Sequence, residues 1–134
     1  MKTVTLTTTL ILVIASLTNY VHAQEKLEAF MNETTPEERA ELQTNYMKES
    51  LALTSDQEIK IQDLNLKYAK KMQDVYNTPD RKFQKLKRMK GVSTEKDQEM
   101  KSILNPDQYA TYEKNKEEMK EKMRSRAKER RNKE

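Results

Sequence analysis

Apolar residues recur at helical spacing along this chain, and this feature limits its fold more than any other. The clearest stripe lies between Ser55 and Tyr76, where apolar residues return every three or four positions. That spacing places them on one face of an α-helix. The stripe consists of Ile61, Leu64, Tyr68, Met72 and Val75, and Ile59 and Leu66 broaden it. Because no strand-like alternation competes with this pattern after the first 23 residues, we predict an all-α fold.

The chain has few apolar residues from which to build a large core. Charged residues make up 36% of it, and its mean hydropathy is −1.08. Helices of about 20 residues extend some 30 Å, so such a chain forms long rods that share thin apolar seams. We therefore predict an elongated, thin, antiparallel arrangement of about four helices. A single copy would leave its stripes partly exposed, which favours a cradle-like homodimer.

The first 23 residues resemble a secretory signal peptide. A lysine at position 2 precedes the apolar run "LILVIASL", and "VHA" ends at a suitable cleavage site. The alternative is an uncleaved membrane anchor, but the run is about half of the roughly 20 residues that a membrane span needs. We expect export, with residues 24–34 as a flexible arm or partial helical turn. A helical domain over 35–123 follows, and then a charged tail over 124–134 that is either a fraying helix or a solvated segment.

The pentapeptides "LTSDQ" at 53–57 and "LNPDQ" at 104–108 are nearly the same, and both predict a helix start. In each, the second residue caps the helix, and the glutamine three positions later closes a capping box. The acidic residue between them lies near the positive end of the helix dipole. Thr35, Pro36 and Glu38 form a third start signal. The motif residues are Leu53, Thr54, Gln57, Leu104, Asn105 and Gln108, which we interpret as structural caps before binding residues.

These signals divide the chain into four expected helices. They cover about 36–51, 55–76, 79–104 and 106–123. Gly91 lies in the third and has two interpretations: it ends one helix before another begins, or it is a weak point in one long helix. We favour the continuous helix.

The composition excludes most catalytic chemistry. The chain has no cysteine, and its one histidine, His22, lies in the expected leader. A thiolate or imidazole metal site, a cysteine nucleophile and a Ser-His-Asp triad are therefore absent after cleavage. The acidic pairs Glu37/Glu38 and Glu117/Glu118 have no sign of an enclosing pocket. We predict no catalysis, metal or cofactor, and we assign the dispersed methionines to core filling or an adaptable surface instead of a copper site.

Together, the export signal, helical pattern, lack of cysteine and paired pentapeptides resemble the Spy/CpxP family of periplasmic LTxxQ-motif stress proteins. "LTSDQ" fits the family motif, and in "LNPDQYATYEK" Asn105 replaces threonine. The resemblance covers about 36–123. It implies a periplasmic, cradle-shaped homodimer of antiparallel helices. Spy-like members are ATP-independent chaperones that hold unfolded or misfolded envelope proteins, whereas CpxP-like members act on the periplasmic domain of an envelope-stress sensor kinase.

A client-holding surface needs positive charge and soft apolar groups, and the segment 81–91, "RKFQKLKRMKG", supplies both. The candidate client-binding residues are Arg81, Phe83, Lys85, Arg88 and Met89. Alternatively, the apolar members belong to the core and the cations form a solvated face. The basic C-terminal end has interleaved glutamates and no aromatic residue, so we expect it to be solvated and to bind neither nucleic acid nor membrane. We expect no membrane insertion after leader cleavage.

Overall fold

The computed structural model describes residue 22 and residues 24–133. The chain divides into two compact units, Met1–Glu33 and Thr34–Glu134. The predicted leader, 1–23, lies outside the described residues except for His22. In the first unit, residues 24–33 are helical, although we expected a flexible arm or a partial turn over 24–34. The described residues therefore hold five helices and not four.

The second unit contains four helices, whose starts follow the predicted capping signals. They are α2 (Pro36–Leu51), α3 (Ser55–Asn77), α4 (Lys82–Ile103) and α5 (Pro106–Arg131). Complete capping boxes open α2, α3 and α5, from Thr35, Thr54 and Asn105 respectively. The capping interpretation of both pentapeptides is confirmed.

Helix α4 begins without this device but continues through its glycine. Its N-cap residue, Arg81, makes no side-chain cap hydrogen bond. Gly91 is exposed and helical, and α4 runs unbroken past it. The continuous-helix alternative is therefore correct.

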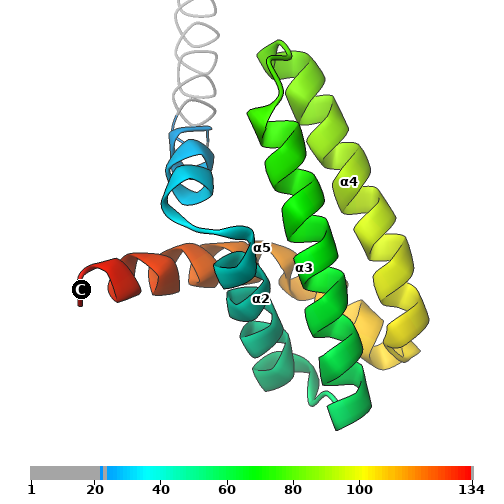
Figure 1. Cartoon of the computed structure of the whole chain (residues 1–134). Coiled ribbons are helices and arrows are strands. Elements are labelled where there is room, and N and C mark those ends of the chain that lie inside the picture. Colours follow the sequence, from blue (N-terminus) through cyan, green and yellow to red (C-terminus); the bar gives the residue numbers. More distant parts are fainter. Residues whose placement is uncertain (1–21, 23, 134) are drawn as a thin grey trace, which may run out of the picture. The chain divides into compact units, whose positions relative to one another are not determined.

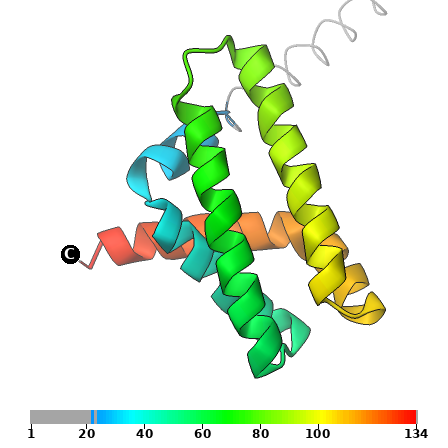
Figure 2. The same ribbon diagram turned by 45° about the vertical axis from the view of Figure 1, so that its right-hand side comes forward.

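Helices α2, α3 and α4 form two successive antiparallel hairpins (Figures 1 and 2). Ion pairs link the neighbouring helices. Beside the α2–α3 turn, the Nζ of Lys48 lies 2.8 Å from the Oε1 of Glu58. Between α3 and α4, Lys67 pairs with Glu99 at 2.7 Å, and Lys71 with Glu95 at 2.9 Å. Helix α5 crosses α2 and packs against it (Figure 1).

The core of the second unit uses the predicted stripes. Its buried apolar residues include Leu42, Tyr46, Met47, Leu51, Ile61, Leu64, Tyr68, Val75, Met89, Met100, Leu104, Tyr112, Met119, Met123 and Ala127. Five of these are methionines, so the core-filling interpretation holds for them. Ile59 is a correction: we placed it beside the α3 stripe, but it is 64% exposed because it lies one position off the buried face. Within the described residues a single copy buries most of its stripes, and Ile59 and Phe83 are the large apolar side chains that it leaves exposed. The homodimer stays a prediction.

The expected charged tail is largely helix. Helix α5 continues to Arg131, eight residues beyond the predicted domain end at Met123. Ala127 is buried four positions after Met123, so the apolar stripe continues with a small residue. Two ion pairs hold the extension against α2: Arg126 to Glu49 at 2.8 Å and Arg130 to Glu41 at 3.0 Å. The tail therefore packs on α2 and is not simply solvated.

Candidate functional site

The two pentapeptides, 51 positions apart at their glutamines, meet in the structure through these two side chains. The Nε2 of Gln57 donates to the Oε1 of Gln108 at 2.7 Å. The Nε2 of Gln108 donates back to the Oε1 of Gln57 at 3.0 Å. We call this reciprocal pair, Gln57 and Gln108, the glutamine joint.

Each amide in the glutamine joint also caps two helix ends. Its oxygen accepts from the backbone N–H of its own cap residue, Thr54 or Asn105, at 3.1 Å in both cases. Its nitrogen donates to the last carbonyl of a helix in the other half of the joint. These bonds run from Gln57 to the carbonyl of Ile103 at 3.1 Å and from Gln108 to that of Leu51 at 3.2 Å.

The joint therefore satisfies every hydrogen-bonding position of both amides, since a primary amide offers two donors and two acceptor sites. It also satisfies one unpaired carbonyl at the end of α2 and one at the end of α4. The residue after α2, Ala52, adopts the left-handed conformation with φ 49°. No other non-glycine residue in the described part of the chain has a positive φ.

Both glutamines are half-buried. Their amides have no donor or acceptor left for a ligand, so the joint is structural.

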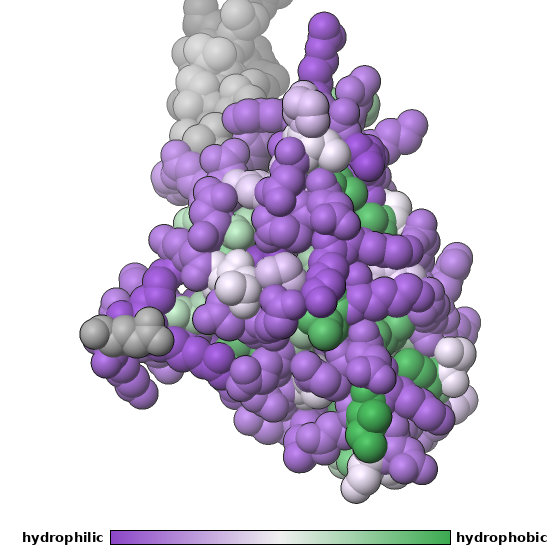
Figure 3. Space-filling model, viewed as in Figure 1, coloured by the Kyte–Doolittle hydropathy of each residue, from purple (hydrophilic) through white to green (hydrophobic). Residues whose placement is uncertain are grey.

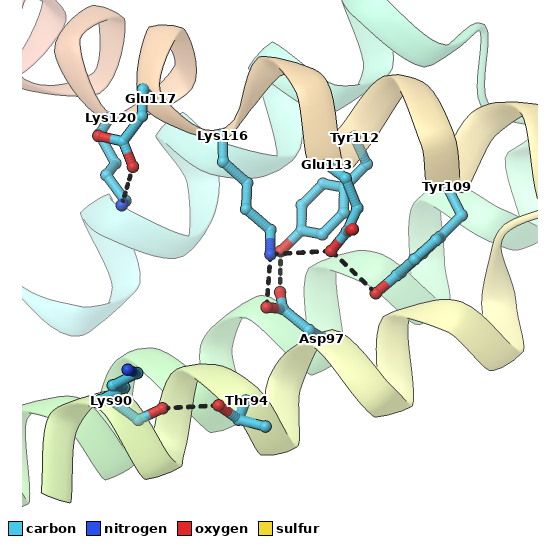
Figure 4. A network of polar contacts seen from close by, with 9 residues as sticks. All are labelled: Lys90, Thr94, Asp97, Tyr109, Tyr112, Glu113, Lys116, Glu117 and Lys120. Carbon is cyan, nitrogen blue, oxygen red and sulfur yellow. Dashed lines mark hydrogen bonds and ion pairs between the residues drawn. The ribbon is translucent and has the colours of Figure 1, made fainter. Parts of the chain in front are cut away.

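A second polar cluster connects α4 to α5 and was not predicted (Figure 4). The hydroxyl of Tyr112 donates to the Oδ1 of Asp97 at 2.8 Å, and the ammonium of Lys116 donates to its Oδ2 at 2.5 Å. Lys116 also pairs with Glu113 at 3.1 Å, which accepts from the hydroxyl of Tyr109 at the same distance. Burial raises the pKa of Tyr112, and the Asp97 carboxylate raises it further. At neutral pH the phenol is therefore a stable hydrogen-bond donor.

The other side of α4 repeats this arrangement with α3. Tyr68 donates to Glu99 at 2.7 Å, and Lys67 pairs with the same carboxylate. Burial and the hydrogen bond to Glu99 raise the pKa of Tyr68 to about 12. The C-terminal half of α4 is thus held on both sides by a tyrosine, a carboxylate and a lysine.

Lys96 and Asn65 are polar side chains in the packed part of the unit. The ammonium of Lys96 donates to the Oε1 of Gln43 on α2 at 2.6 Å. Burial lowers the pKa of Lys96 to about 7, although the neighbouring Asp97 opposes the shift. Asn65 on α3 is fully buried and donates to Thr44 at 2.9 Å, but its Oδ1 has no partner among the described residues. Sequence reasoning missed both, because Asn65 and Lys96 resemble the many polar residues on exposed faces.

The candidate client-binding residues separate into two groups. Arg81 is exposed, and Phe83 is 78% exposed at the start of α4. Met89 is buried, and so the core alternative holds for it but not for Phe83. Lys85 is half-buried, donates to the carbonyl of Tyr76 at 2.6 Å and lies over its ring. Arg88 pairs with Asp80 at 2.5 Å. Of the five, Arg81 and Phe83 are exposed and have no side-chain partner among the residues that the structure describes.

The described part of the chain lacks two further features. It contains no group of three or more acidic or histidine side chains arranged to hold a metal ion. None of its helices combines the length and apolar content of a membrane span.

Comparisons with known proteins place the chain in a family. Neither the curated proteins nor the solved structures gave a match. A family model, described as a domain of unknown function (DUF4890), matches residues 23–112, a stretch that includes both pentapeptides. Since the match covers more than half of the chain, the protein belongs to the DUF4890 family.

Proposed function

We propose that the protein is a periplasmic, Spy/CpxP-like binding protein that holds unfolded or misfolded envelope proteins without ATP, metal or cofactor. The resemblance gains support from the glutamine joint, because the joint gives both LTxxQ-type pentapeptides one shared structural role. A repeated motif that forms two halves of one contact is more specific than two independent helix caps.

The exposed apolar residues of the α3–α4 hairpin support client binding most directly. Among the described residues, two large apolar side chains are exposed, Ile59 at 64% and Phe83 at 78%, and they lie near the starts of α3 and α4. These starts are at opposite ends of the hairpin, and the face in Figure 3 shows small apolar patches separated by hydrophilic surface. Separate apolar contacts give weak, adaptable binding to chains without fixed shape, whereas one broad patch promotes self-association.

A prevention-of-aggregation assay tests this proposal. The client should be a disulfide protein that aggregates when reduced, because this chain has no cysteine and the reductant leaves it unchanged. We expect the chain from Gln24 onward to suppress light scattering at a several-fold molar excess. The Ile59→Gln/Phe83→Gln variant should lose most of this protection, whereas Ala110→Gln, at an exposed site on α5, should retain it. No suppression by the wild-type protein would remove the chaperone proposal.

A CpxP-like regulator remains the alternative function. It predicts a saturable one-to-one complex with the periplasmic domain of a sensor kinase, recovered by cross-linking, and little effect on general clients. The proposal also includes a homodimer, which sedimentation measures directly. Because one copy buries most of its own stripes, a monomer would remove the cradle geometry but leave the client-binding residues in place.

A further inference from the structure

The far end of the α3–α4 hairpin extends beyond α2 in the second unit (Figures 1 and 2). Arg39, in the first turn of α2, donates to the Oε1 of Gln73 at 2.6 Å, which places the start of α2 level with this part of α3. Beyond the level of Gln73, the hairpin continues past the start of α2 in both views (Figures 1 and 2). We call residues 76–90 the hairpin tip. It consists of the end of α3, the connecting turn and the first turns of α4.

The hairpin tip concentrates the positive charge of the protein. Residues 81–94 contain six basic residues and no acidic one. The expected exported chain, from Gln24 onward, has a net charge of about +3 after Lys2 is removed from the total of +4. The remainder of that chain is therefore net negative, and the tip is a local basic site.

Most of these cations make no ion pair with the described residues. Lys85 and Arg88 are engaged by the carbonyl of Tyr76 and by Asp80. The other four are exposed, and no carboxylate in the described part of the chain lies within ion-pair distance of them. These four are Arg81, Lys82, Lys87 and Lys90. Several lysines of α3 and α5, by contrast, pair with nearby glutamates, namely Lys67, Lys71, Lys120 and Lys122.

Phe83 lies among these cations and is 78% exposed. One aromatic ring on a projecting end buries little area against a folded protein, whose stable interfaces take about 800 Å² from each partner. A bilayer interface accepts a single projecting ring and binds flanking cations through lipid phosphates. The shape and chemistry of the tip thus favour a soft anionic surface over a folded acidic partner.

We propose that the hairpin tip docks on the surface of a bilayer that contains anionic phospholipid. The four unpaired cations contact the headgroup phosphates, and the Phe83 ring enters the boundary between headgroups and acyl chains. The docking is peripheral, and no helix crosses the bilayer. With one ring and a few cations, binding is reversible and sensitive to salt.

Flotation with lipid vesicles tests this proposal on the chain from Gln24 onward. At low salt, we expect binding to vesicles of phosphatidylcholine with 30% phosphatidylglycerol and none to vesicles of phosphatidylcholine alone. Bound protein should be released near 1 M salt, where the Debye length is only about 3 Å. The Lys82→Gln/Lys87→Gln/Lys90→Gln variant should bind on the order of 100-fold more weakly, if each lysine contributes as juxtamembrane lysines do.

Matched variants distinguish the contribution of the tip to vesicle binding from the effects of net charge and of exposed apolar side chains in general. Elsewhere in the described part of the chain, Lys60, Lys114 and Lys128 are exposed lysines that make no ion pair there. Their triple replacement by glutamine lowers the net charge by the same amount as the tip triple. That control should bind within about threefold of wild type, as should Ile59→Gln, whereas Phe83→Gln should bind several-fold more weakly. Far-ultraviolet circular dichroism confirms that each variant keeps its helices.

Three results would overturn the proposal: no binding to anionic vesicles, equal loss in both lysine triples, or binding to soluble polyglutamate that exceeds binding to vesicles. The last result would assign the tip to acidic polypeptides. The aggregation assay contains no lipid, so failure here is distinguishable from failure of the proposed client-binding function.

Discussion

The glutamine joint and the hairpin tip lie at opposite ends of α3 and α4 and follow opposite rules. At the joint, both helix starts have capping boxes and an acidic first turn, and the glutamine amides are fully hydrogen-bonded. At the tip, α4 starts with no side-chain cap, no acidic residue in its first turn and a run of cations near the positive end of its dipole. The joint is built for stability, whereas the tip is not.

The helix start at the tip differs from the two helix starts at the joint by one residue of the capping box. The cap position and the third helical position read Thr54 and Gln57 in α3, Asn105 and Gln108 in α5, and Arg81 and Gln84 in α4. Helix α4 thus has the glutamine of a capping box but an arginine in place of the capping residue. Functional surfaces commonly forgo available stability in this way, which agrees with a binding role for the tip.

The largest expected effect comes from removal of the joint. Gln108→Ala leaves the Leu51 carbonyl and the Gln57 amide without their partners, and we expect it to lower the free energy of unfolding by about 2 kcal/mol. Gln57→Ala should cost a similar amount. Because the two side chains form one unit, the double variant should cost clearly less than the sum of the two.

Denaturant unfolding measures this effect, and Gln84→Ala is the matched control at the tip. Gln84 is exposed and closes no capping box, so its replacement should change the free energy of unfolding by less than about 0.5 kcal/mol. Equal costs at Gln84 and Gln108, or strict additivity at the joint, would contradict the distinction between the two ends.

The second prediction concerns Lys96, which is half-buried on α4 while the lysines of the tip are exposed. Burial lowers its folded-state pKa to about 7 from an ordinary 10.5. Between these values the unfolded chain holds a proton that the folded chain has released, so stability rises with pH above about 7. Below pH 7 both states are protonated, and the penalty for burying the ammonium is fully present.

Unfolding at several pH values between 6 and 9 tests the prediction. Other groups with shifted pKa values do not titrate in this window. The pKa values of Glu37, Glu99 and Glu113 are lowered and lie below it. Those of Tyr68 and Tyr112 are raised and lie above it. Wild type should therefore gain stability toward pH 9, whereas Lys96→Met should show a nearly flat profile. Parallel profiles would mean that Lys96 keeps its ordinary pKa in the folded chain.

The sequence predicted local features of the fold well, since helix starts and apolar stripes depend on residues three or four positions apart. It predicted all three capping boxes and the buried face of α3. It did not predict that the glutamines of two such boxes pair, because a capping box requires only its own helix. The near-identity of the two pentapeptides was the one available signal.

Errors arose where a side chain's position depends on a distant helix. The end of α5 was predicted as a fraying helix or a solvated tail because it lacks large apolar residues, but Ala127 is buried and this end packs on α2. Ile59 and Phe83 occupy apolar positions that no neighbouring helix covers. The polar cluster around Asp97 was missed for the same reason, since Tyr112 and Lys116 come from α5.

The third prediction converts the tip into a copy of the joint's helix starts. Arg81 has the extended backbone of an N-cap, with φ −60° and ψ 146°. Arg81→Thr should complete a capping box with Gln84 and raise the free energy of unfolding by about 1 kcal/mol. Adding Gln84→Ala to this variant should remove part of the gain, although Gln84→Ala alone has little effect. If Arg81→Thr leaves stability unchanged in denaturant unfolding, the missing cap is not what distinguishes the tip.

The smallest expected effect concerns Gly91, which lies on α4 between the tip and the joint. A Cβ added there would meet nothing within 4 Å, and the residue is helical, so alanine fits without strain. Gly91→Ala should raise the free energy of unfolding by about 0.5–1 kcal/mol, because glycine costs this much in a helix interior. Ala110→Gly, at an exposed site on α5, should lower it by a similar amount. Amide hydrogen exchange shows which part of α4 gains stability. If Gly91 lets the tip open independently of the joint, the alanine should slow exchange at 82–90 more than at 98–103. Equal slowing along α4 would show that the two ends already open as one unit.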